Sequence, residues 1–233
     1  IYYAGQSLGA IYGTIFNALE PDVAKAVLNV GGGSIVDIVR WGRAYRDYAV
    51  QFLSMRGLLN RGRDFDEQYV LRWRPVQVAG APGAIEVQTF FESLEWLHAA
   101  GDPLSYAPHL VSSTLPGVPI KQVLWQFAKG DRTVPNPATS ALIRAANMRE
   151  SAWMYRHDLA RQVFAGLPDD PHTYLVNILS LPALPVALAA QQHMANFFLL
   201  EPGAVPDPNA GLRLLFGLSP FEIPGLLPEE LNY

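Results

Sequence analysis

The stretch Gly5-Gln6-Ser7-Leu8-Gly9 has the pattern G-x-S-x-G. It follows an apolar, β-branched and aromatic run at residues 1–4 and precedes residues 10–19, in which apolar side chains recur at helical spacing. In this context the pattern predicts a serine on a sharp turn between a strand and a helix, flanked by two glycines because a Cβ at either would collide with neighbouring backbone. Ser7 is therefore a candidate nucleophile. The alternative is a glycine-rich turn whose serine only caps the helix.

Composition limits the classes of protein to consider. The chain has 233 residues, is 50% hydrophobic and carries a net charge of −4, so it can bury one sizeable core. It has no run of Lys or Arg, which argues against nucleic acid as the main partner. It has no cysteine, and its five histidines lack metal-ligand spacing, so we expect no metal site. The most apolar long segment, 174–200, is interrupted by Asn, Pro, Gln and His, which predicts a buried segment rather than a membrane span.

The apolar runs predict an α/β fold. The run 26–30 follows the first helix closely, and a strand, a helix and a second strand in so short a stretch indicate a parallel βαβ unit. Two further runs, at 121–127 and 151–155, predict the third and fourth strands.

Residues 34–117 differ in character from the rest. An amphipathic pattern predicts one long helix from 34 to about 53, and a second helix begins at Ala84. No strand pattern is present before about residue 119. We interpret 34–117 as a mainly helical cap over the site, and the alternative is a set of ordinary sheet-covering helices. The predicted organisation is a core of 1–33 and 118–200, a cap insertion of 34–117 and a C-terminal tail of 201–233.

A nucleophilic serine needs a base within hydrogen-bond reach, usually a His held by a carboxylate. Asp131 lies directly after the third predicted strand, between Gly130, which permits a tight bend, and Val134-Pro135. Active groups gather at the carboxyl ends of such strands, so Asp131 is the candidate carboxylate. The alternative is that it only caps the next helix or forms an Asx turn.

His172 is the preferred base because it lies in a loop after the last strand and follows Asp131 in the order Ser, Asp, His. His193 is the second choice, since it lies on the apolar face of the last predicted helix, where packing is the usual explanation. His157, His98 and His109 remain further alternatives.

Three motifs together resemble the serine α/β-hydrolases: Gly5 to Gly9, Gly130-Asp131 with Val134-Pro135, and Pro171-His172-Thr173-Tyr174-Leu175. Residues 28–33 and Asp102-Pro103-Leu104 are similar more particularly to bacterial extracellular lipases of the virulence-factor type. The resemblance implies an eight-stranded sheet of which this chain supplies the last four strands. The first strands and one oxyanion-hole donor would precede Ile1.

The resemblance also implies a function. The backbone N–H of Leu8 would be the other oxyanion donor, no cofactor would be needed, and Gln6 would leave the chemistry unaffected. We expect a secreted or cell-surface esterase or lipase acting on a small-molecule ester with an apolar acyl group, whose cap could also contact a lipid interface. The alternatives are a serine peptidase or aminoacyl hydrolase on the same fold, and a non-catalytic binding module.

Overall fold

The computed structural model describes residues 1–67, 69–71, 77–201 and 204–231, which form an α/β fold around a five-stranded sheet. The strand order is β1-β2-β5-β6-β7, and the first four strands are parallel. The predicted class and the four predicted strands are therefore confirmed. The strands are β1 (Tyr2–Gln6), β2 (Lys25–Asn29), β5 (Gln122–Ala128), β6 (Ala152–Tyr155) and the antiparallel β7 (Phe221–Glu222).

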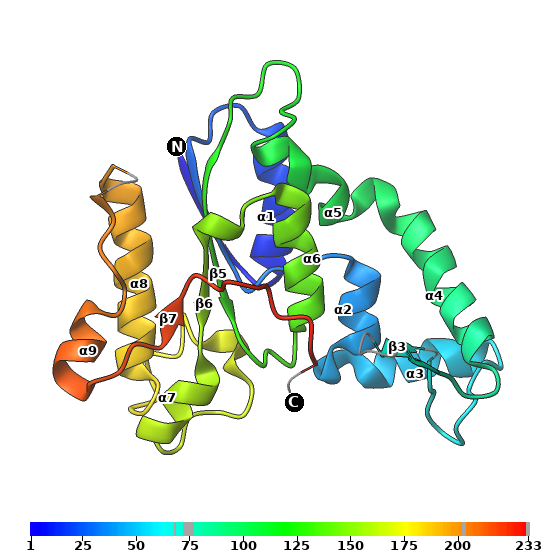
Figure 1. Ribbon diagram of the computed structural model, residues 1–233. Helices are drawn as coiled ribbons and strands as arrows, with labels where there is room; N and C mark the ends of the chain where they lie inside the picture. The colour runs from blue at the N-terminus through cyan, green and yellow to red at the C-terminus, as the bar shows by residue number, and fades with distance from the viewer. Residues whose placement is uncertain (68, 72–76, 202–203, 232–233) are drawn as a thin grey trace.

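Helices cover both faces of this sheet (Figure 1). Helices α1 (Leu8–Leu19) and α6 (Asn136–Ala146) lie on one side, and α8 (Leu184–Leu199) lies on the other. Alternate side chains of β5 pack on opposite faces of the sheet. Trp125 packs in the cluster with α1 and α6, whereas Leu124 packs against Phe197 of α8. This two-sided burial explains why the strand reads as a nearly continuous apolar run.

The prediction of one long helix over 34–53 is wrong, because the helix is interrupted at Gly42. The structure has α2 (Ile35–Trp41), a 3₁₀ turn η1 (Arg43–Tyr45) and α3 (Arg46–Met55). Gly42 is extended, and a Cβ on it would lie 2.4 Å from the carbonyl oxygen of Ile38 and 2.7 Å from that of Thr133. The break lets the backbone approach the loop that follows β5.

The second helix predicted in this region is confirmed as α4 (Ala84–His98), but the expected absence of strands is wrong. A two-stranded antiparallel hairpin, β3 (Tyr69–Leu71) and β4 (Gln77–Ala79), precedes α4. Strands of three residues are too short to produce a recognisable alternation. Helices α2, α3 and α4 share a small apolar cluster of their own and extend to one side of the sheet (Figure 1).

The rest of the predicted cap packs on the core. The segments η2 (Ala99–Gly101), α5 (Pro103–Tyr106) and η3 (Ala107–Leu110) follow α4, and Ala107 and Leu110 lie in the same buried cluster as residues of α1 and α6. The predicted tail contains a helix, α9 (Ala210–Phe216), and strand β7. The remaining helical elements are η4 (Arg149–Ser151), α7 (His157–Val163) and η5 (Pro171–Thr173). Within the described part of the chain, every helix is too short or too polar to cross a bilayer.

Candidate active site

Ser7 stands on the sharp turn between β1 and α1. Its backbone has φ 55° and ψ −120°, a conformation that few residues other than glycine adopt and that is typically held by surrounding structure. A Cβ on Gly5 would lie 2.3 Å from the carbonyl oxygen of Gly9, so a glycine is required there as predicted. The same prediction is wrong for Gly9, where an added Cβ would meet nothing closer than the Tyr3 hydroxyl at 4.0 Å.

The Ser7 side chain does not cap the helix that it precedes. Its Oγ lies 2.7 Å from Nε2 of His172, a residue 165 positions later in the chain. This geometry argues against a serine that only caps α1. Leu8 is the first residue of α1, so the helix supplies no partner for its backbone N–H, and the positive end of the helix dipole lies at the same place.

Asp131 lies in the turn after β5, where Gly130 has φ 81°. Its Oδ1 accepts hydrogen bonds from the backbone N–H groups of Thr133 (2.9 Å) and Val134 (2.8 Å), which is the Asx-type turn considered as the alternative. Its Oδ2 lies 2.8 Å from Nδ1 of His172. The two oxygens thus have separate roles, one in the turn and one on the histidine.

The partners of His172 assign its tautomer. An ionised carboxylate only accepts hydrogen bonds, so Nδ1 carries the proton toward Asp131 and Nε2 accepts from the Ser7 hydroxyl. Burial raises the pKa of Asp131, and its hydrogen bond with His172 opposes this rise. The imidazole is held in the orientation that a general base for Ser7 requires.

Asp170 fixes the two loops that carry Asp131 and His172. One of its carboxylate oxygens accepts from the backbone N–H groups of Arg132 and His172, both at 3.1 Å, and the other accepts from the Thr133 hydroxyl at 2.8 Å. The sequence interpretation missed this residue. The sequence pattern that could have pointed to Asp170 is Asp followed by Pro. This pair is common at the start of a helix, where Asp caps the first turn and Pro occupies its first position.

Gln6 supports His172 from the strand side. Its Nε2 donates to the carbonyl oxygen of His172 at 3.2 Å. This hydrogen bond ties the end of β1 to the loop that carries His172. The expectation that Gln6 leaves the chemistry unaffected stays a prediction, and its hydrogen bond to the His172 carbonyl adds a positioning role.

The other candidate bases have different surroundings. His193 is buried on α8, where its ring packs edge-on against Trp153 and its Nδ1 lies 3.3 Å from Nε2 of Gln126. Burial lowers the pKa of His193 to about 4, as expected for a neutral histidine inside a core. His157 contacts the Tyr155 hydroxyl and a backbone carbonyl. Of the histidines considered, the structure brings His172 to Ser7 and Asp131.

An apolar cavity of about 160 Å³ opens beside Ser7. Helix α2 supplies one wall and the first turns of α1 supply another, so the break at Gly42 and the turn at Ser7 together shape it. Apart from Ser7 and two tyrosines, its lining is aliphatic. The lining residues are Ser7, Leu8, Ile11, Tyr12, Ile35, Ile38, Val39, Tyr45 and Val134.

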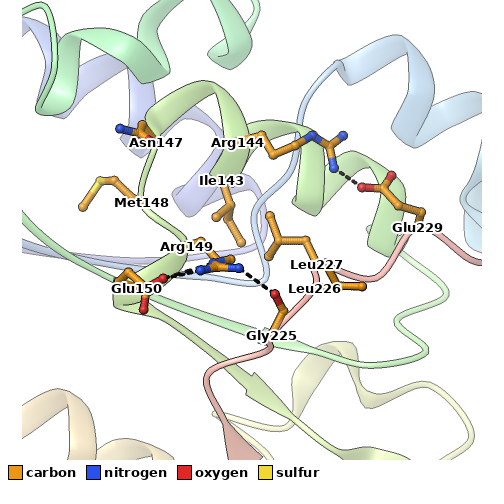
Figure 2. A pocket seen from close by; sticks show the side chains of 10 residues that line it. All are labelled: Ile143, Arg144, Asn147, Met148, Arg149, Glu150, Gly225, Leu226, Leu227 and Glu229. Atoms are coloured by element: carbon orange, nitrogen blue, oxygen red, sulfur yellow. Dashed lines mark hydrogen bonds and ion pairs between the residues drawn. The ribbon is translucent and has the colours of Figure 1, made fainter.

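A larger cavity, of about 600 Å³, lies at the end of α6 against the tail and shares no lining residue with the cavity at Ser7. Its charged groups are paired with one another: Arg144 with Glu229, and Arg149 with Glu150 (Figure 2). Arg149 also donates to the carbonyl oxygen of Gly225. Among the described residues, no cluster of three or more His, Asp or Glu side chains could hold a metal ion.

No family model, curated protein or solved structure matches this chain. The functional interpretation therefore depends on the geometry of the site.

Proposed function

We propose that this chain is a serine hydrolase of the α/β-hydrolase fold that cleaves carboxylic esters through an acyl-enzyme on Ser7. The observation that carries the proposal is the hydrogen-bonded series Asp131–His172–Ser7, with distances of 2.8 and 2.7 Å, on a serine held at a strained strand-to-helix turn. The parallel sheet supports it, because Ser7 and Asp131 follow the carboxyl ends of β1 and β5.

The proposed reaction has two acyl-transfer steps. Ser7 Oγ attacks the ester carbonyl carbon while His172 Nε2 takes the hydroxyl proton, and Asp131 stabilises the imidazolium that results. The tetrahedral intermediate then expels the alcohol, which receives the proton from Nε2. Water next attacks the acyl carbon and gives a proton to Nε2. The second tetrahedral intermediate then expels Ser7 Oγ, which takes that proton back from Nε2, and the carboxylic acid is released.

The oxyanion of each tetrahedral intermediate faces the start of α1 in this proposal. The N–H of Leu8 donates to it, and the helix dipole adds a favourable field. The insertion between β2 and β5 acts as the cap, since Ile35, Ile38 and Val39 of α2 line the cavity beside Ser7. An apolar wall of this kind suits an acyl group better than a charged or polar one.

Ester and amide substrates presented side by side test the reaction class. We expect turnover of 4-nitrophenyl butanoate to exceed that of the corresponding 4-nitroanilide by at least about 10²-fold, because an anilide nitrogen is the poorer leaving group. Ser7→Ala should abolish both activities, with Ser113→Ala, at an exposed serine that does not line the cavity, as the matched serine control. Faster cleavage of the anilide would instead make the chain a peptidase-type hydrolase, and no turnover of either would support a binding module.

A further inference from the structure

A second apolar cavity, of about 450 Å³, lies between α2, α3 and α4. All three helices contribute aliphatic or aromatic side chains to it, and of the residues that line it only Arg56 and His98 are polar. Phe52 and Met55 on its α3 side are 52% and 76% exposed. Large apolar side chains around a hollow of this size are typical of a ligand site rather than of an ordinary surface.

This cavity adjoins the one at Ser7 along two residues of α2. Ile35 and Val39 line both cavities. They are four positions apart, so they lie one above the other on the same face of the helix. The neighbouring side chains diverge: Ile38 lines the cavity at Ser7, and Val36 lines the larger one. Ile35 and Val39 thus form a ridge with the nucleophile on one side and the larger cavity on the other.

The volumes of the two cavities indicate how long an acyl chain each of them can hold. A methylene group occupies roughly the volume of a water molecule, about 30 Å³, so the 160 Å³ cavity at Ser7 holds about five carbons. A longer acyl chain attached at Ser7 reaches the larger cavity by crossing the Ile35–Val39 ridge.

The chemistry of the walls favours the acyl side of an ester as the occupant. An unbranched acyl chain has no polar atom beyond its carbonyl group, so it loses no hydrogen bond in an apolar cavity. The alcohol part of a glyceride carries further ester oxygens, which these walls would leave without donors. The acyl chain is also the part that stays bonded to Ser7 after the alcohol has left.

We infer that the cavity between α2, α3 and α4 receives the distal part of an unbranched acyl chain of more than about six carbons, so that the preferred substrates are medium- and long-chain esters. This inference rests on the proposed function. Each methylene that enters the cavity should raise kcat/KM by up to about fourfold, the equivalent of about 0.8 kcal/mol.

The test compares 4-nitrophenyl decanoate with 4-nitrophenyl butanoate below their micelle-forming concentrations. Leu94→Trp fills the larger cavity from α4, and Met55→Trp fills it from α3. Leu97→Trp is the matched control, because Leu97 lies on α4, is 71% exposed and does not line the cavity. We expect the decanoate-to-butanoate ratio of kcat/KM to fall at least tenfold in the two filling variants and to stay within twofold in the control.

The outcomes separate this inference from the function on which it rests. If the butanoate is hydrolysed in a Ser7-dependent way and the decanoate-to-butanoate ratio of kcat/KM is the same in all three variants, the proposed function is supported and the inference is overturned. If the filling variants instead lower the ratio of kcat/KM for decyl acetate to that for butyl acetate, the cavity receives the alcohol part of the ester, and this result would also overturn the inference. If the wild-type chain hydrolyses neither ester, both proposals fail. Melting temperatures of each variant identify any that do not fold, and the two filling variants act from different helices.

Discussion

Replacing His172 with alanine will lower kcat for ester hydrolysis by about 10⁶-fold. His172 Nε2 lies 2.7 Å from Ser7 Oγ, so its loss removes both the base that activates the serine and the acid that protonates the leaving alcohol. The measurement is steady-state turnover of a 4-nitrophenyl ester by wild type and variant, with the variant's melting curve recorded to show that it folds.

His193→Asn is the matched control for this prediction. Asparagine keeps an acceptor near the Gln126 amide in the core, and we expect kcat to stay within about threefold of wild type, since His193 does not contact the triad. The reverse pattern, with activity lost in His193→Asn and kept in His172→Ala, would contradict the assignment of the base.

Asp131→Asn will lower kcat by about 10⁴-fold with little loss of stability. The amide oxygen of asparagine can still accept the backbone hydrogen bonds from Thr133 and Val134, so the turn is kept. Its NH₂ group would then face His172 Nδ1 and favour the tautomer in which Nε2 carries the proton, which cannot deprotonate Ser7.

The matched control for this change is Asp169→Asn. Asp169 lies in the loop before His172, its side chain is 66% exposed, and its ion pairs with Arg132 and Arg161 are on the surface. Exposed ion pairs contribute about 0–1 kcal/mol, so neither kcat nor the melting temperature should change appreciably. An equal loss of activity in both variants would mean that charge in the loop, rather than the orientation of His172, is what matters.

The parts of the fold that could be predicted from the sequence are those whose signal is local. Strands β2, β5 and β6 appear as apolar runs because they are buried, β1 appears as one although Tyr2 on it is 54% exposed, and α1 and α4 appear as periodic patterns. The break at Gly42 could not be predicted in this way, since the close approach that it permits is to the Thr133 backbone in a distant segment. The hairpin β3–β4 and strand β7 are too short to show a period.

The candidate site was predictable to the extent that chemistry restricts residue type. A serine nucleophile needs a histidine and a carboxylate, and the positions after strand ends narrowed the choice to Asp131 and His172, which the structure places together with Ser7. The supporting contacts of Asp170 and Gln6 could not be predicted. They join loops that lie far apart in the sequence, and Asp or Gln in a loop has many common explanations.

The most direct test of the proposed mechanism is the mass of the protein after reaction with a fluorophosphonate. This reagent transfers its phosphonyl group to an activated serine and expels fluoride. We expect one adduct per chain, located by peptide mapping on the segment that contains Ser7 and absent in Ser7→Ala and in His172→Ala. A folded wild-type chain that gains no adduct, or one whose adduct persists in Ser7→Ala, would contradict the assignment of Ser7 as the nucleophile.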